Sequence, residues 1–192
     1  MNPSDKKNIL MQVEAILAYF QASDGSDYSR QLNGLMDLRQ LSTDSEAARN
    51  ELRRLIYEGD GAIRIHAAEA LSLSCSYPKD AIPVLIAVLD VCRENDMIEK
   101  SESWLKVALG AIANYKEDAI LAEDSVWPYI YTQENLNLQL FAITAISQMA
   151  KVSNASWTIL CLLCRHENQA IRDFSRAIME SNYFKEYMKN DI

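Results

Sequence analysis

Two cysteines placed three positions apart, Cys161 and Cys164, have the spacing in this sequence that most readily suggests chemistry. On a helix this spacing puts both sulfurs on one side, and His166 follows closely, as in part of a zinc site. A structural zinc site needs four ligands, however, and Cys75 and Cys92 are distant in the sequence. A redox-active pair is typical of a helix N-terminus that follows a strand, whereas this pair lies in an apolar stretch. We therefore predict thiols that pack as small apolar side chains and bind no metal.

The sequence shows no other pattern that indicates catalysis. His66 and His166 are the only histidines, and no carboxylate or nucleophile converges on either of them in the pattern that acid–base chemistry requires. The segment Gly59-Asp60-Gly61 is too short to cradle a phosphate and is predicted to be a turn between helices. We therefore predict no catalytic residue and no cofactor.

Acidic residues are concentrated between positions 90 and 124. This stretch contains nine acidic and four basic residues, a net charge of −5 out of −8 for the whole chain. Much of it falls in two predicted connections between helices, 93–102 and 116–124. A solvated edge that only maintains solubility and a binding surface are equally compatible with this pattern. If the edge binds, its partner is a protein with a basic surface, and the attraction accelerates encounter more than it deepens affinity.

Tyrosine adds a second feature to this region. Tyr129 and Tyr131 are two positions apart on a predicted helix, so they cannot both face the core, and one of them should be exposed. An exposed tyrosine is a frequent anchor of protein interfaces. The partner contacts that we predict are Glu94, Asp96, Glu99, Glu117, Asp118, Glu123, Asp124 and Tyr131.

The chain carries no pattern typical of export or of membrane insertion. Glu14 interrupts the apolar stretch from Ile9 to Phe20, and no convincing cleavage site follows. The longest apolar runs, 81–89 and 157–164, are far shorter than the roughly 20 residues that span a bilayer. We expect a cytoplasmic protein with reduced thiols and no membrane contact. The net charge of −8 makes nucleic acid an unlikely partner, because phosphate contacts need cations.

Helices must position all of these residues. The chain has only 5 Gly and 4 Pro, which disfavours a sandwich or a barrel with many tight turns. An apolar frame at offsets 0, 4, 7 and 8 recurs along the sequence at intervals of 35, 41, 34 and 33 residues. The frames begin at Tyr28, Ile63, Trp104, Leu138 and Ile171.

Second helices are predicted between these frames. One presents an apolar face over residues 48–56, and the others open at Asp80–Pro83, at Asp124–Pro128 and at Asn154–Ser156. Proline suits a helix opening, because its missing N–H has no partner in the first turn. Each unit is therefore predicted to be a helix pair. The small residues of the frames should let the first helices approach one another closely, so that stacked pairs bury a continuous core. These residues are Ala67, Ala70, Ala108, Ala111, Ala142 and Ala145.

The stretch Ile63-Arg64-Ile65-His66-Ala67-Ala68-Glu69-Ala70-Leu71, followed by Asp80-Ala81-Ile82-Pro83-Val84-Leu85, resembles the two helices of a unit of the HEAT-repeat superfamily. Ile171-Arg172 resembles the start of another first helix, and the resemblance covers residues 26–182. It implies an all-α, right-handed α-α superhelix of about five helix pairs. The implied single domain, 1–192, has a cap helix at 5–20, repeats at 26–59, 60–97, 98–132, 133–166 and 167–188, and a closing stretch through Tyr183, Phe184, Tyr187 and Met188.

Such repeats imply a scaffold without catalytic residues. We predict a non-catalytic, acidic protein-binding module, an adaptor or an inhibitor, in one version an immunity- or antitoxin-like protein. Two alternatives stay open, because some phycobilin lyases resemble HEAT arrays and some alkyl-purine DNA glycosylases use HEAT-like repeats. A DNA-binding protein would need a basic groove, for which Arg49, Arg53 and Arg54 form the only local cluster that we identified.

Overall fold

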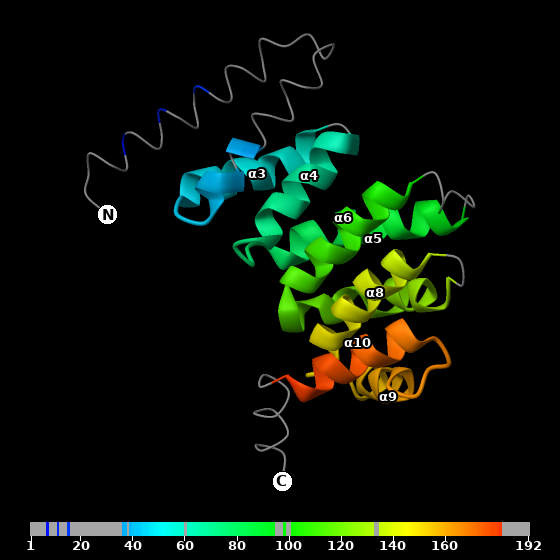
Figure 1. Cartoon of the computed structure of the whole chain (residues 1–192). Coiled ribbons are helices and arrows are strands. Elements are labelled where there is room, and N and C mark those ends of the chain that lie inside the picture. Colours follow the sequence, from blue (N-terminus) through cyan, green and yellow to red (C-terminus); the bar gives the residue numbers. More distant parts are fainter. Residues whose placement is uncertain are drawn as a thin grey trace. The chain divides into compact units, whose positions relative to one another are not determined.

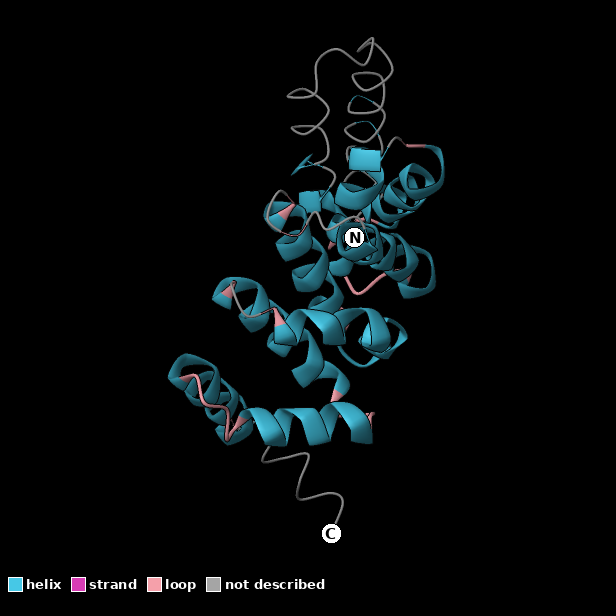
Figure 2. Ribbon diagram, turned by 90° about the vertical axis from the view of Figure 1, so that its right-hand side faces the viewer, coloured by secondary structure: helices cyan, strands magenta, loops and turns pink. Residues whose placement is uncertain are grey.

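The computed structural model describes residues 7, 11, 15, 36–37, 39–59, 61–94, 98, 101–132 and 135–181, and the regular elements within these ranges are all helices (Figure 1). The prediction of an all-α protein is therefore confirmed for this part of the chain, where Figure 2 shows helices joined by short loops. None of the described helices is long and apolar enough to cross a membrane. The predicted cap helix 5–20, the frame at Tyr28 and the closing stretch 183–188 lie outside the described residues, apart from isolated positions.

The chain divides into two compact units, residues 1–88 and 89–192. The described part of the first unit contains α3 (Glu46–Glu58), α4 (Gly61–Ser72) and the beginning of α5 (Pro78–Glu94). The side chain of Ser45 caps α3 by accepting the Ala48 N–H at 3.2 Å. Helices α3 and α4 pack directly against each other.

The turn between α3 and α4 requires a glycine at one of its two glycine positions. A Cβ on Gly59 would lie 2.6 Å from the Leu55 carbonyl oxygen and 2.7 Å from Cγ2 of Ile63, so a larger residue would displace one helix. A Cβ on Gly61 would meet nothing within 4 Å. The prediction of an interhelical turn here is confirmed, and Gly59 is the residue that allows the close approach.

The second unit is arranged around α8 (Leu136–Met149). Before it come α6 (Glu102–Asn114), η1 (Lys116–Ala122), α7 (Glu123–Val126) and η2 (Trp127–Tyr131), and after it come α9 (Asn154–Leu163) and α10 (Gln169–Glu180). Helix α8 packs against each of these elements. It lies between α6 and α10 in Figure 1, so these three first helices of successive frames are neighbours.

The apolar frames in the middle of the chain are buried as predicted, except that Trp104, the first member of its frame, is only half-buried. The six alanines of the frames at Ile63, Trp104 and Leu138 are at most 2% exposed. The frame of α10 is looser, since Ile171 and Ser175 are buried but Ile178 is only half-buried. Met36, at the end of the Tyr28 frame, is 58% exposed, so that frame does not bury its last member.

Two predicted helix openings were wrong in detail. Helix α5 begins at Pro78, so Pro83 lies beyond the first turn instead of within it. The predicted helix opening at Asp124 is instead part of a succession of three short helices, η1, α7 and η2. Pro128 lies in the first turn of η2, where its missing N–H needs no helical partner. The opening at Asn154 is confirmed, with the Ser153 side chain accepting the Ser156 N–H.

Candidate functional site

Three exposed acidic side chains of the second unit lie on the short helices between α6 and α8. Glu117 and Asp118 occupy the first turn of η1, Asp124 the first turn of α7, and Tyr131 the end of η2, and all four are exposed. We call these four residues the acidic run. Glu94 is also exposed but ends α5, a separate element. Asp96 and Glu99 lie outside the described residues.

The carboxylates around the acidic run differ in whether they have a cationic partner. Asp90 accepts a hydrogen bond from Arg93 at 3.2 Å, and Glu102 pairs with Lys106. The hydrogen bond from Lys106 lowers the pKa of Glu102, and a second one from Asn135 adds to the effect. Within the described ranges, no ion pair involves the carboxylates of the acidic run or Glu94. Their negative charge is therefore available to a partner.

Glu123 has a different role from its acidic neighbours. Its Oε1 accepts the hydroxyl of Ser153 at 2.5 Å and also the hydroxyl of Ser156. Ser156 is fully buried, and the two serines stand at the beginning of α9. Glu123 therefore ties the start of α7 to the start of α9. Glu123 is predicted from the sequence to be a surface contact, whereas its observed bonds are internal.

The two tyrosines of η2 divide as predicted. Tyr129 is 1% exposed, and its hydroxyl donates to the Leu89 carbonyl at 2.5 Å. Burial raises the pKa of Tyr129 far above its ordinary value. Tyr131 is 64% exposed and has the open aromatic face that a contact anchor needs.

The cysteine pair lies at the end of α9 rather than at a helix beginning. Cys161 and Cys164 are half-buried, and Cys164 is the C-terminal cap of the helix. Burial raises the pKa of the Cys164 thiol, and the neighbouring Cys161 adds to this, so the thiolate that metals and oxidants require is disfavoured. Among the residues that the structure describes, no group of three or more His, Cys, Asp or Glu side chains could hold a metal ion.

The three arginines of α3 are held by hydrogen bonds inside the chain. Arg49 donates to the Ser42 carbonyl at 2.8 Å, Arg53 to Asp80 Oδ2 at 2.6 Å, and Arg54 to both Glu51 and Glu58. A phosphate backbone would have to compete with these bonds. The basic cluster of the sequence is therefore a poor nucleic-acid surface.

Asp80 belongs to a polar network that joins the beginning of α5 to α3. Besides the bond from Arg53, its Oδ1 accepts the Tyr57 hydroxyl at 2.5 Å, and the Arg53 guanidinium lies 4.8 Å from the centre of the Tyr77 ring. The Tyr57 hydrogen bond, and after it Arg53, lower the pKa of Asp80 against the opposing effect of burial. The partners are 23 and 27 positions away in the sequence, so no local spacing indicated the network.

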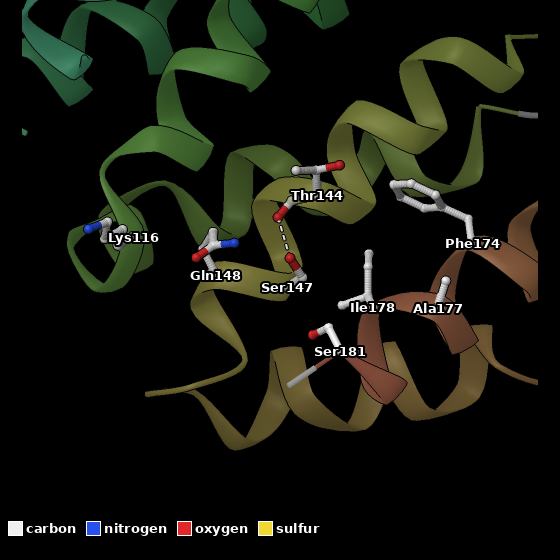
Figure 3. A pocket seen from close by; sticks show the side chains of 8 residues that line it. All are labelled: Lys116, Thr144, Ser147, Gln148, Phe174, Ala177, Ile178 and Ser181. Atoms are coloured by element: carbon white, nitrogen blue, oxygen red, sulfur yellow. Dashed lines mark hydrogen bonds between the residues drawn. The ribbon is translucent and has the colours of Figure 1, made fainter. Parts of the chain in front are cut away.

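A groove of about 460 Å³ lies in the second unit between α8 and α10 (Figure 3). Helix α8 lines it with Thr144, Ser147 and Gln148. Phe174, Ala177, Ile178 and Ser181 line the opposite side, on α10 and directly after it, and Lys116 stands at one end. On each helix the lining residues are three or four positions apart, so they share one helical face, and the sequence alone could have predicted this. Only packing shows that the two faces oppose each other.

Comparisons of the chain with protein-family models, with curated proteins and with solved structures give no match. The function must therefore be argued from the geometry alone.

Proposed function

We propose that this chain is a non-catalytic protein-binding module, an adaptor or an inhibitor, that engages a basic surface of a protein partner. The observation that carries the proposal is the acidic run, where three exposed carboxylates without an ion pair in the described ranges lie on consecutive short helices that end in exposed Tyr131. Charges of one sign steer an oppositely charged partner into contact, and tyrosine supplies contact area at little entropic cost.

The proposed scaffold is a HEAT-like α-solenoid. Support comes from the buried alanines and from a device that occurs twice. Arg64 donates to the Ile56 carbonyl at 2.7 Å, and Arg172 donates to the His166 carbonyl at 2.8 Å. Each arginine follows an isoleucine at the start of a frame, and each one donates back to a carbonyl of the preceding segment, in the last turn of α3 for Arg64 and in the turn after α9 for Arg172. The same device in two units distant in sequence is expected of an internal repeat.

The proposed compartment is the cytoplasm, where the four cysteine thiols stay reduced. No described residue points to a tetrapyrrole or to a nucleic acid, so protein binding is the only function that we propose.

The test measures association with a partner obtained by co-purification from native lysate and identified by mass spectrometry. The double variant Glu117→Lys/Asp118→Lys should lower the association rate constant about tenfold at low salt, and the loss should shrink as salt screens the charges. The matched control is Glu167→Lys/Asp173→Lys, which changes the net charge equally on two exposed residues away from the acidic run. It should stay within about twofold of the unchanged protein, because the steering is local.

Three results would contradict the proposal. They are a partner without a basic surface, equal effects of the two double variants, and the absence of any stoichiometric protein partner.

A further inference from the structure

The groove between α8 and α10 differs in chemistry between its two sides. Its α10 side presents Phe174, Ala177 and Ile178, which offer apolar surface. Its α8 side presents the hydroxyls of Thr144 and Ser147 and the amide of Gln148. An apolar strip beside a polar strip suits a ligand that has both kinds of surface along its length.

The hydroxyls on the α8 side have already donated their hydrogens. Thr144 donates to the Leu140 carbonyl at 2.8 Å, and Ser147 donates to the Thr144 carbonyl at 2.7 Å (Figure 3). A hydroxyl has one hydrogen, so only lone pairs remain to face a ligand. The two hydroxyls therefore suit a ligand with N–H or O–H donors, which a hydrocarbon chain lacks and a polypeptide backbone supplies at nearly every residue.

Positive charge stands at one end of this groove. Lys116 is exposed, and no ion pair to it is found within the described ranges, although Glu117 and Asp118 follow it directly. The side-chain amide oxygen Oε1 of Gln148 accepts a hydrogen bond from Lys151 Nζ, which leaves the two hydrogens on Gln148 Nε2 as donors. In Figure 3, Lys116 and Phe174 stand at opposite ends of the groove. An anionic group at the Lys116 end and an apolar group near α10 would complement both.

The length of the groove limits the size of the ligand. From Phe174 to Ser181 the chain rises about 10 Å at 1.5 Å per residue. An extended polypeptide advances about 3.3 Å per residue, so the groove accommodates about three residues.

We propose that this groove binds the C-terminal end of a partner polypeptide. The terminal carboxylate lies at Lys116 and Gln148, apolar side chains lie against Phe174 and Ile178, and backbone N–H groups donate to the oxygens of Thr144 and Ser147. The proposal deepens the protein-binding role proposed above and rests on it for the nature of the ligand. The groove would be a second contact with the partner, beside the acidic run and of different chemistry.

The test uses fluorescein-labelled five-residue peptides, Gly-Ser-Ala-Ala followed by Leu, Ile or Phe, with either a free carboxylate or a C-terminal amide. Fluorescence anisotropy gives the affinity, and amide chemical shifts of the ¹⁵N-labelled protein locate the contact. We expect the free acids to bind with shifts on α8, α10 and Lys116, and the amides to bind about fivefold more weakly, since an exposed charge pair contributes modestly.

Two variants and one matched control test the groove itself. Lys116 has a φ of 55°, a conformation that glycine adopts readily, so Lys116→Gly removes the ammonium without disturbing the fold and should weaken binding about fivefold. Ala177→Trp fills the apolar side from an exposed position and should weaken binding tenfold or more. Ala155→Trp makes the same change on an exposed residue of α9 outside the groove and should have no effect.

Equal affinity for acids and amides, no binding at millimolar peptide, or equal losses in the two tryptophan variants would overturn the proposal. So would displacement of the peptides by decanoate with no preference for the free acid, because the ligand would then be an apolar small molecule.

The peptides are tested without a basic partner, so the two proposals can fail separately. If the peptides bind but the acidic run has no partner, only the proposed function fails. If a partner binds the acidic run but the peptides do not bind, only the groove fails.

Discussion

The outer face of α3 in the first unit and the acidic run of the second unit are both rich in charge, but they differ in where the charges are directed. On α3, Arg53 and Arg54 donate to carboxylates of the same unit. On η1, Glu117 and Asp118 are exposed, and no ion pair to them occurs within the described ranges. The contrast shows that the number of charges does not identify a binding surface. Charges that are paired inside the chain already have partners, and charges without such partners remain available to another molecule.

The cores of the two units are alike, and a core substitution should have the largest effect. Ala142 is fully buried on α8, where the structure packs helices on several sides. Ala142→Leu inserts three heavy atoms into a packed interface, and we expect it to lower the free energy of unfolding by about 3 kcal/mol. Ala67→Leu on α4 should act similarly in the first unit, since Ala67 is also fully buried. Urea denaturation followed by circular dichroism measures both. A change below about 0.5 kcal/mol, typical of a surface position, would contradict the buried frame.

Among the carboxylates of the short helices, Glu123 is held by hydrogen bonds inside the chain, so it should contribute to stability as the α3 residues do. Glu123→Ala leaves the hydroxyls of Ser153 and Ser156 without their acceptor, and we expect a loss of about 2 kcal/mol in the free energy of unfolding. Asp124→Ala removes the same charge from an exposed position and should change stability by less than about 0.5 kcal/mol. Equal effects of the two substitutions would mean that Glu123 is an ordinary surface carboxylate.

The network of Asp80 predicts a dependence of stability on pH. Its pKa is lowered in the folded state, so its contribution is present at neutral pH and is lost as pH falls below the ordinary value of 3.8. Tyr57→Phe removes the hydrogen bond that contributes most to this shift and should raise the pKa of Asp80 toward that value. We expect it to lower stability at pH 7 only slightly, because Tyr57 is exposed and water competes for its hydrogen bond. Carboxyl ¹³C NMR titration of the two proteins measures the shift, and an unchanged Asp80 pKa would show that the hydroxyl is not bound in solution.

Left-handed backbone at non-glycine residues provides a further test of the comparison between the two units. Tyr77 in the first unit has a φ of 51° and Lys116 in the second has a φ of 55°. Lys116→Gly should raise the free energy of unfolding by up to about 1 kcal/mol, because it relieves the strain at little other cost. Tyr77→Gly should not stabilise, since it removes the ring beneath Arg53 and the hydrogen bond to Asn50. Thermal melting of the two variants measures the difference. A stabilised Tyr77→Gly would show that the Tyr77 contacts add nothing.

The helices and the buried frames could be read from the sequence because both depend on local periodicity. Residues such as Ala108, Ala111, Ala142 and Ala145 are found where the 3.6-residue repeat of a helix places them. Periodicity also predicted that only one of Tyr129 and Tyr131 is exposed, because positions two apart on a helix face different ways. The acidic composition of the region between α5 and α8 was also evident, although not which carboxylates are exposed.

Other features of the protein depend on contacts between segments that are distant in the sequence, and only the tertiary structure shows them. Glu123 meets serines 30 and 33 positions away, and Asp80 meets an arginine 27 positions away. The groove exists because the faces of α8 and α10 oppose each other with Lys116 at one end. Local periodicity fixes which face of a helix is apolar, but the distance and the orientation between two helices follow from how all their side chains pack together. The sequence alone therefore determined the elements and their buried sides, and the packing decided which polar groups are satisfied within the chain and which remain to meet a partner.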